Sequence, residues 1–516
     1  MHERPSLAHL RHHRTRPCLP DSWLRRRYCG VILQPDHIAR LRECLEGFTA
    51  DAVLQTLGTP AWRALARNET VPGLRAVPEG TSCEVLTRLF TLQATINEAS
   101  ARRVFGDLLG HLIDADILAS DAAGIRALVD IRPYGDETHD WLVVSDLTPG
   151  LNGISSQIRP DYVLGISEAS SSLARLTARR PIARALDLGT GCGVQSLHLA
   201  THASEVVATD VNQRALALAQ LTSHLNEIDV KFVEGSLYEP VDGTFDLIVT
   251  NPPFVVSPPE GERLVYRETD FEGDDIVRNV VTGAASYLAD DGMCQVLAAW
   301  IEPTGQPWDE RLASWIEPTG LDAWVVRRES IDLPEYTEMW LADSGLARGP
   351  EFSRRYEHWL NWFTSKGIES MGFGWINLHK SGRNQPDVRI DDNPAPVREP
   401  VGIEFAAWPD RLKSIGNNSL LERSWTVAPD VVEETIARPG AEHPNSITLR
   451  RTTGLAPSIQ LDTIGAGFVS ACDPELTAAQ IFEGIATILG LDPDETKRQH
   501  ESLVEDLARD GFIVSG

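Results

Sequence analysis

The sequence lacks the features that mark exported, metal-binding and membrane-spanning proteins. Its seven cysteines are scattered and form no C-x-x-C pair, so neither a disulfide framework nor a zinc site is indicated. No H-E-x-x-H motif occurs among its fourteen histidines. No apolar run approaches the roughly 18–20 residues that a membrane helix needs, and the N-terminus lacks the apolar core of a signal peptide. We therefore expect a cytoplasmic protein that neither spans a membrane nor holds a metal.

Positive charge is also scarce. The chain has 47 Lys and Arg residues against 74 Asp and Glu residues, a formal net charge of −27, and such a field repels polyanions at long range. Residues 1–30 are the exception, because they hold seven arginines and only two acids. We interpret this segment as a basic disordered tail, with an arm that contacts RNA as the alternative.

At 516 residues the chain is too long for one ordinary hydrophobic core, and we expect three folded domains after the tail. Residues 31–150 have helical apolar spacing and end in two short strands, a winged-helix-like pattern. Residues 151–382 alternate strands and helices, which predicts a parallel sheet. A Pro-rich linker at 381–400 leads to a C-terminal α+β domain, residues 383–516, whose end has helix, helix and strand character.

The middle domain is expected to be a Rossmann-like α/β fold with seven strands. A helical insertion at 334–366 precedes the closing strand, Gly372–His379. The hexapeptide Trp-Ile-Glu-Pro-Thr-Gly occurs at 300–305 and again at 315–320, which is too few copies for a solenoid. The other six predicted strands are Ala185–Leu188, Glu205–Thr209, Val230–Val233, Phe245–Thr250, Met293–Ala298 and Ala323–Arg327.

A glycine-rich turn follows the first of these strands. Gly189, Gly191 and Gly193 alternate along the chain after Asp187, and a helix begins directly behind them. Glycines let the backbone turn tightly and approach a ligand, while the free N–H groups of a helix N-terminus bind a carboxylate. This arrangement suits the amino-acid end of S-adenosylmethionine, whereas dinucleotide enzymes use the spacing G-x-G-x-x-G.

Two further positions complete the predicted cofactor site. Asp210 ends the second strand, where a carboxylate can accept hydrogen bonds from both ribose hydroxyls. A helix cap is the alternative role for Asp210. Ser236 and Leu237 follow the third strand, beside the expected position of adenine.

The tetrapeptide Asn251-Pro252-Pro253-Phe254 directly follows the fourth strand. Strand ends at the carboxyl edge of such a sheet face the ligand crevice, so the turn is expected beside the methyl group of the cofactor. The Asn251 side-chain oxygen and the Pro252 carbonyl can accept both hydrogens of an NH₂ group. Phe254 is expected to stack on the flat face of the same amide or base.

The glycine turn and the Asn-Pro-Pro-Phe turn together resemble the group of release-factor glutamine methyltransferases and small methyltransferase-domain RNA methyltransferases. The resemblance covers residues 150–382. It implies that Asp187 and the three glycines line the methionine part, that Asp210 binds the ribose, and that Asn251 with Phe254 holds the target nitrogen. The implied activity is S-adenosylmethionine-dependent methylation of a planar nitrogen, on a protein glutamine or a related small molecule.

Two alternatives to this function remain open. The acceptor can instead be an amino group of RNA or DNA, adenine N6 or guanine N2, or the chain can be an inactive methyltransferase-fold binding module. Seven acids and two arginines lie between Glu260 and Asp275, just beyond the predicted catalytic turn. This local charge disfavours a phosphate backbone, so we place a protein or small-molecule acceptor slightly above nucleic acid.

Overall fold

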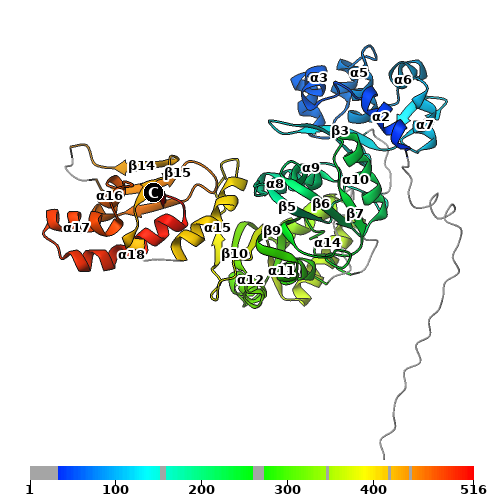
Figure 1. Cartoon of the computed structure of the whole chain (residues 1–516). Coiled ribbons are helices and arrows are strands. Elements are labelled where there is room, and N and C mark those ends of the chain that lie inside the picture. The colour runs from blue at the N-terminus through cyan, green and yellow to red at the C-terminus, as the bar shows by residue number, and fades with distance from the viewer. Residues whose placement is uncertain (1–32, 152–157, 260–271, 344–347, 417–419, 441–443) are drawn as a thin grey trace, which may run out of the picture.

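The computed structural model describes residues 33–151, 158–259, 272–343, 348–416, 420–440 and 444–516. An eight-stranded sheet lies at the centre of the molecule, with a helical module at each end of the chain packed beside it (Figure 1). The predicted basic tail, residues 1–30, lies outside the described residues. No helix in the described ranges is long and apolar enough to cross a membrane.

The N-terminal module, residues 33–151, consists of short helices followed by two hairpins, whereas the sequence predicts only the second of them. Local capping explains several helix starts, since Thr49 and Asn97 accept backbone N–H groups and Thr81 forms a capping box with Glu84. The helical elements are α2 (Pro35–Cys44), α3 (Ala50–Leu65), α4 (Val71–Ala76), α5 (Ser82–Leu86), the π-helical turn η1 (Thr87–Thr91), α6 (Glu98–Phe105) and α7 (Leu108–Asp114). The strands are β1 (Leu118–Asp121), β2 (Gly124–Ala127), β3 (Asp130–Gly135) and β4 (Asp140–Ser145).

The central sheet has the order β12-β10-β11-β9-β8-β5-β6-β7 and is parallel except at β11, which confirms the predicted α/β class. All seven predicted strands are present. They are β5 (Ile182–Leu188), β6 (Ala203–Asp210), β7 (Lys231–Glu234), β8 (Phe245–Thr250), β9 (Leu288–Pro303), β10 (Asp322–Asp332) and β11 (Ile368–His379).

The eighth strand, β12 (Val388–Asp392), corrects the interpretation of residues 381–400 as a linker. It pairs in parallel with β10 at the edge of the sheet, where its charged residues find partners. Arg389 contacts Asp391 on β12 and Asp510 at the C-terminal end of the chain. The sequence does not predict this strand, because it has only five residues and lies among prolines that are typical of a linker.

Helices cover both faces of the sheet, and the alternation of side chains along each strand supplies a core to each face. On one face, α11 (Asp275–Tyr287) and α12 (Trp308–Ile316) pack against Leu186, Ile248 and Val296. On the other face, α8 (Glu168–Leu176) and α15 (Gly402–Gly416) pack against Leu247 and Trp324. The helices that follow β5 and β6 are α9 (Val194–Ala200) and α10 (Gln213–Leu225).

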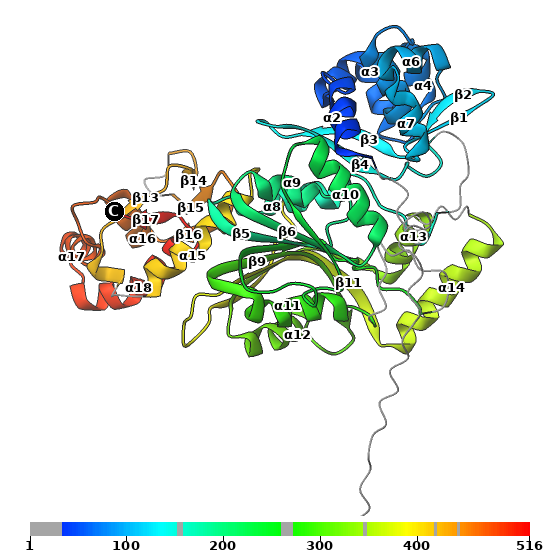
Figure 2. The same ribbon diagram turned by 45° about the vertical axis from the view of Figure 1, so that its right-hand side comes forward.

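The insertion predicted at 334–366 is a pair of helices, α13 (Leu333–Asp343) and α14 (Pro350–Ser365), between β10 and β11. Because β10 and β11 are antiparallel neighbours, this pair lies at the same sheet edge as the carboxyl end of β8, and we call it the α13–α14 arm (Figure 2).

The C-terminal module ends with the predicted helix, helix and strand. It has its own core around Phe468, Phe482 and Leu507, and α15 joins it to the central sheet. The division of the chain at residue 382 stays a prediction, since both β12 and α15 contact the sheet. The remaining elements are η2 (Glu317–Thr319), η3 (Leu420–Glu422), β13 (Trp425–Val427), β14 (Val431–Ile436), β15 (Ser446–Arg451), β16 (Ser458–Leu461), α16 (Thr463–Ser470), α17 (Ala478–Leu489), α18 (Pro493–Arg509) and β17 (Ile513–Ser515).

Candidate active site

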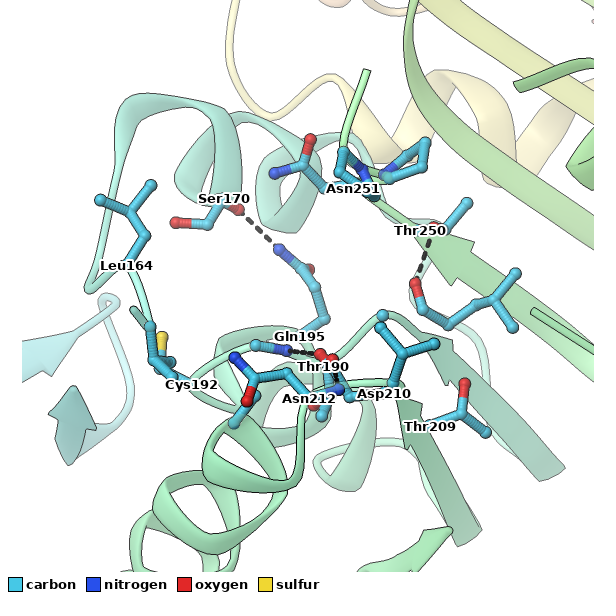
Figure 3. A pocket seen from close by; sticks show the side chains of 18 of the residues that line it. Leu164, Ser170, Thr190, Cys192, Gln195, Thr209, Asp210, Asn212, Thr250 and Asn251 are labelled. Carbon is cyan, nitrogen blue, oxygen red and sulfur yellow. Dashed lines mark hydrogen bonds between the residues drawn. The ribbon is translucent and has the colours of Figure 1, made fainter. Parts of the chain in front are cut away.

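A cavity of about 530 Å³ lies at the carboxyl ends of β5, β6 and β8. The strand order reverses between β5 and β8, and this is where open α/β sheets bind their ligands. The volume falls within the range of small-molecule sites, about 300–1,000 Å³. Its wall comes from the segment 162–170, the glycine turn, the end of β6, residues 235–237, the Asn-Pro-Pro turn and Ile276. Figure 3 shows Asp210 and Asn251 on opposite sides of this cavity.

The glycine turn wraps over the end of β6 and presents two of its three glycines to the cavity. Gly189 and Gly191 line the cavity with φ values of 80° and 56°, a conformation that favours glycine. A Cβ atom at either position would have no neighbour within 4 Å, so the space beside them is open. Gly193 does not line the cavity, because it packs against Ala219 of α10. Its role is helix packing.

Asp187 supports the glycine turn from below and does not line the cavity. It is 1% exposed, and its Oδ2 atom accepts hydrogen bonds from the hydroxyls of Thr190, at 2.6 Å, and Ser196, at 2.7 Å. Burial raises the pKa of Asp187 to about 6 despite these bonds, and the neighbouring carboxylate of Asp210 adds to the shift. Asp187 thus ties the turn to the first turn of α9.

Asp210 lines the cavity at the end of β6. Its two oxygens accept the N–H groups of Gly191, at 2.9 Å, and Asn212, at 2.8 Å, and burial raises its pKa. The cap of α10 is Asn212, whose side chain accepts the N–H of Arg214. The alternative interpretation of Asp210 as the helix cap is therefore wrong, and its role as a ribose ligand stays a prediction.

Ser236 and Leu237 line the cavity beyond β7, together with Gly235. Leu237 has a φ of 46°, and Ile276 of α11 forms another apolar part of the wall. An apolar wall of this kind suits the flat face of adenine.

Asn251 lies at the end of β8 with its side chain at the cavity. The preceding strand is fixed, because the Thr250 hydroxyl donates to the Leu188 carbonyl of β5 at 2.7 Å. The Asn251 Oδ1 atom is buried and accepts no hydrogen bond from any described residue. Pro252 and Pro253 also line the cavity, and their place beside the methyl group of the cofactor stays a prediction.

Phe254 departs from its predicted position, since it packs toward the α13–α14 arm and does not line the cavity. Its ring stands nearly perpendicular to Trp340, at 6.5 Å between centroids, and to Phe373 of β11, at 6.3 Å. Two residues further along, the Val256 N–H donates to the Tyr336 hydroxyl at 2.8 Å. The arm therefore fixes the chain directly behind the Asn-Pro-Pro turn. The aromatic content of 334–366 was the only sequence signal for this contact.

The segment 162–170 lines the cavity, although the sequence motifs do not predict it as part of the site. It covers the cavity opposite β8, and Gln195 of α9 fixes it by donating to the Ser170 carbonyl at 2.7 Å (Figure 3). Leu164 and Cys192 stand at the same side of the cavity. Neither the charge pattern nor the residue spacing of the sequence predicts that this segment forms a wall of the cavity.

The acidic stretch predicted at the mouth of the site is only partly described, since residues 260–271 lie outside the described ranges. Each of the three acids that follow has a cationic partner. Glu272 pairs with Lys366 at 2.5 Å, and Asp274 pairs with Arg311 at 2.7 Å. These pairs weaken the local charge argument against a phosphate backbone. Within the described ranges no cluster of three His, Cys, Asp or Glu residues could hold a metal ion.

The parallel sheet, the glycine turn after its first strand and the acid at the end of its second define the class. The chain carries a class I methyltransferase domain that uses S-adenosylmethionine. Residues 165–305 match the methyltransferase small domain family. Residues 46–128 and 406–515 each match a domain of unknown function, DUF7059 and DUF7782 respectively.

Curated relatives match the same central part of the chain. The release factor glutamine methyltransferase of Deinococcus radiodurans is 38% identical over 24% of this chain and 47% of its own length. The protein of that name from Haemophilus influenzae is 30% identical over 28% and 55%. The ribosomal RNA small subunit methyltransferase C of Alcanivorax borkumensis is 29% identical over 22% and 32%. The chain thus spans about half the length of the first two relatives, and less of the third.

Proposed function

We propose that the whole chain is an active N-methyltransferase whose acceptor is a planar NH₂ group, with a protein glutamine side chain in first place. The observation that carries this proposal is the Asn251 Oδ1 atom, buried at the cavity with no partner among the described residues. A buried acceptor that is left unpaired costs about 1–3 kcal/mol. A ligand that donates a hydrogen bond to it recovers this free energy, and an NH₂ group is such a donor.

The rest of the cavity provides for the cofactor. The open space beside Gly189 and Gly191 accommodates the amino-acid end, Asp210 accepts the ribose hydroxyls, and Leu237 packs on adenine. Bound S-adenosylmethionine supplies an electrophilic methyl group. We assign Asp187 and Gly193 to the support of this site, because neither lines the cavity.

Asn251 and the Pro252 carbonyl act by orientation. When each accepts one hydrogen of the NH₂ group, the nitrogen lone pair is left to face the methyl group. Transfer forms the new N–C bond as the S–C bond breaks, and one proton passes from the nitrogen to solvent. Orientation of this kind is worth about 7–11 kcal/mol in favourable intramolecular reactions, so no strong base is required.

Support for a glutamine acceptor comes from curated relatives that are named release factor glutamine methyltransferases, the two described above among them. The net charge of −27 also favours a protein over a polyanion. An RNA amino group is the second candidate, supported by the relative that is named a ribosomal RNA methyltransferase. Inactivity is disfavoured because the glycine turn and the Asn-Pro-Pro turn are both intact at the cavity.

The test is to incubate the full chain with methyl-labelled S-adenosylmethionine and a bacterial extract, then to separate protein, RNA and small molecules. Label in protein, located on glutamine by mass spectrometry, supports the proposal, and label in RNA replaces it with the second candidate. The negative control is Asn251→Ala, and the matched control is Asn361→Ala, an exposed asparagine on α14. A chain that binds the cofactor but labels none of the three fractions would refute the proposed function.

A further inference from the structure

The N-terminal module shares a single hydrophobic core with the methyltransferase helices. Buried residues of α2 to α7 and of both hairpins form one cluster with residues of the glycine turn, α9 and α10. From the methyltransferase side this cluster includes Cys192, Val194, Leu197, Leu218 and Leu225. A domain that only docks a partner would have its own closed core. Here the core continues to the helix that begins at the cofactor turn.

Hydrogen bonds between the backbone of β4 and side chains at the C-terminal end of α10 fix the module on this helix. β4 pairs with β3 on one edge, and its other edge faces α10 (Figure 2). Asn226, the C-cap of α10, accepts the Leu142 N–H at 2.9 Å and donates to the Leu142 carbonyl at 2.8 Å. The Val144 N–H donates to the Thr222 hydroxyl at 2.9 Å. These bonds set the register of β4 along the helix.

Asp146, the residue after β4, reaches the wall of the cofactor cavity. Its carboxylate accepts the Val163 N–H at 2.8 Å, and its own N–H donates to the Val163 carbonyl at 3.1 Å. The same carboxylate accepts the Arg214 Nε–H at 3.1 Å in a nearly buried ion pair. Tyr162, Val163 and Leu164 all line the cavity.

The wall is also tied to Asn212, two residues after the predicted ribose ligand Asp210. Asn212 donates to the Asp161 carbonyl at 3.0 Å, and its own N–H donates to Asp210 at 2.8 Å. The segment 161–163 is therefore held between Asp146 of the N-terminal module and the first residues of α10. Moving either support moves the wall relative to Asp210.

We infer that the N-terminal module is a built-in part of the cofactor site, and that Asp146 is the positioning residue through which it holds the cavity wall 162–165. This inference rests on the proposed function only in assigning the cavity to S-adenosylmethionine. Residues 46–128, which match a domain of unknown function, pack in the shared core, while β4 and Asp146, which make the contacts to α10 and the wall, follow that region in the chain.

The test uses the full chain and S-adenosylhomocysteine, the demethylated cofactor, as the probe. Asp146→Asn removes the charge that holds Arg214 and one acceptor, so affinity measured by calorimetry is expected to fall about tenfold. Hydrogen exchange at 162–165 is expected to become faster, and the thermal transition is expected to fall as well, because Arg214 is left without its partner in a nearly buried ion pair. Asp140→Asn is the matched control, because Asp140 is exposed on the same strand.

Arg214→Gln provides a second variant if Asp146→Asn fails to fold. It removes the ion pair but keeps the two Val163 bonds, so a smaller loss of affinity is expected. Unchanged affinity and unchanged exchange at 162–165 in Asp146→Asn would overturn the inference. If the unmodified chain binds no S-adenosylhomocysteine, the proposed function fails, and exchange at 162–165 alone then decides whether Asp146 holds the wall.

Discussion

Asn251→Ala is the substitution for which stability and activity should change in opposite directions. The Asn251 Oδ1 atom is buried without a partner among the described residues, so the free protein carries a cost of about 1–3 kcal/mol at this atom. Alanine removes that cost and loses packing of about 0.8 kcal/mol for each buried methylene-sized group. The net result is a gain of about 1 kcal/mol, which corresponds to a rise of about 2–4 °C in Tm for a domain of this size.

The same substitution should lower the methyl-transfer activity. Losing one hydrogen bond of about 1–3 kcal/mol to the acceptor lowers the transfer rate about 5- to 150-fold, and lost orientation of the NH₂ group lowers it further. Affinity for S-adenosylhomocysteine should stay near that of the unmodified chain, because Asn251 is proposed to contact the acceptor. The loss therefore belongs to the chemical step.

The assay combines differential scanning fluorimetry, calorimetric titration of S-adenosylhomocysteine, and initial rates of label transfer. Asn226→Ala is the matched control, since the amide of Asn226 has hydrogen-bond partners at both its oxygen and its nitrogen. This control should lower Tm, whereas Asn251→Ala raises it. A drop in Tm and in cofactor affinity with turnover retained would refute the reasoning and make Asn251 a structural residue.

Three further outcomes are expected. Burial raises the pKa of Asp187 from 3.8 to about 6, so its stabilising contribution is present below pH 3.8 and lost as pH rises through 6. Asp187→Asn should therefore raise the free energy of unfolding near neutral pH by up to about 3 kcal/mol, which fluorimetry detects as a higher Tm. Near pH 4 the same substitution should change Tm little. Tyr336→Phe should lower the transfer rate about tenfold at unchanged cofactor affinity, while Trp362→Phe, on the same arm, leaves both unchanged. Glu404→Ala leaves the nearly buried Arg411 without its carboxylate and leaves Arg451 with Asp430 alone, and it should cost about 3–5 kcal/mol, seen as earlier thermal unfolding of the C-terminal module.

The parts of the site that depend on local sequence were predictable. Glycine tolerates a positive φ, and Gly189, Gly191 and Gly193 all have one in the tight turn that their spacing predicts. Asp210 and Asn251 follow apolar strands, and the topology of a parallel sheet brings such strand ends to one edge. These residues lie close together in the fold although they are far apart in the sequence, because each is placed by the strand that precedes it.

The remaining parts depend on tertiary packing, which no local pattern records. Phe254 was expected at the acceptor and instead packs on Trp340, a contact that depends on where the arm folds back. Asp146 places the wall at 162–165 through one side-chain and one backbone hydrogen bond to Val163, and neither bond has a signal in the local sequence. The sequence does not predict β12, because five residues among prolines are too few to show the alternation of apolar and polar side chains that marks a strand.

The shared core of the N-terminal module has a consequence for the order of events on the ribosome. β4 can complete its hydrogen bonds only after Asn226 has been made, and the apolar side chains of α2 to α7 stay partly uncovered until then. Translation proceeds at about 5–20 residues per second, so the nascent chain displays this surface for seconds. The first third of the protein therefore keeps apolar surface uncovered until α10 has been made, and its folding is completed by residues that follow it in the chain.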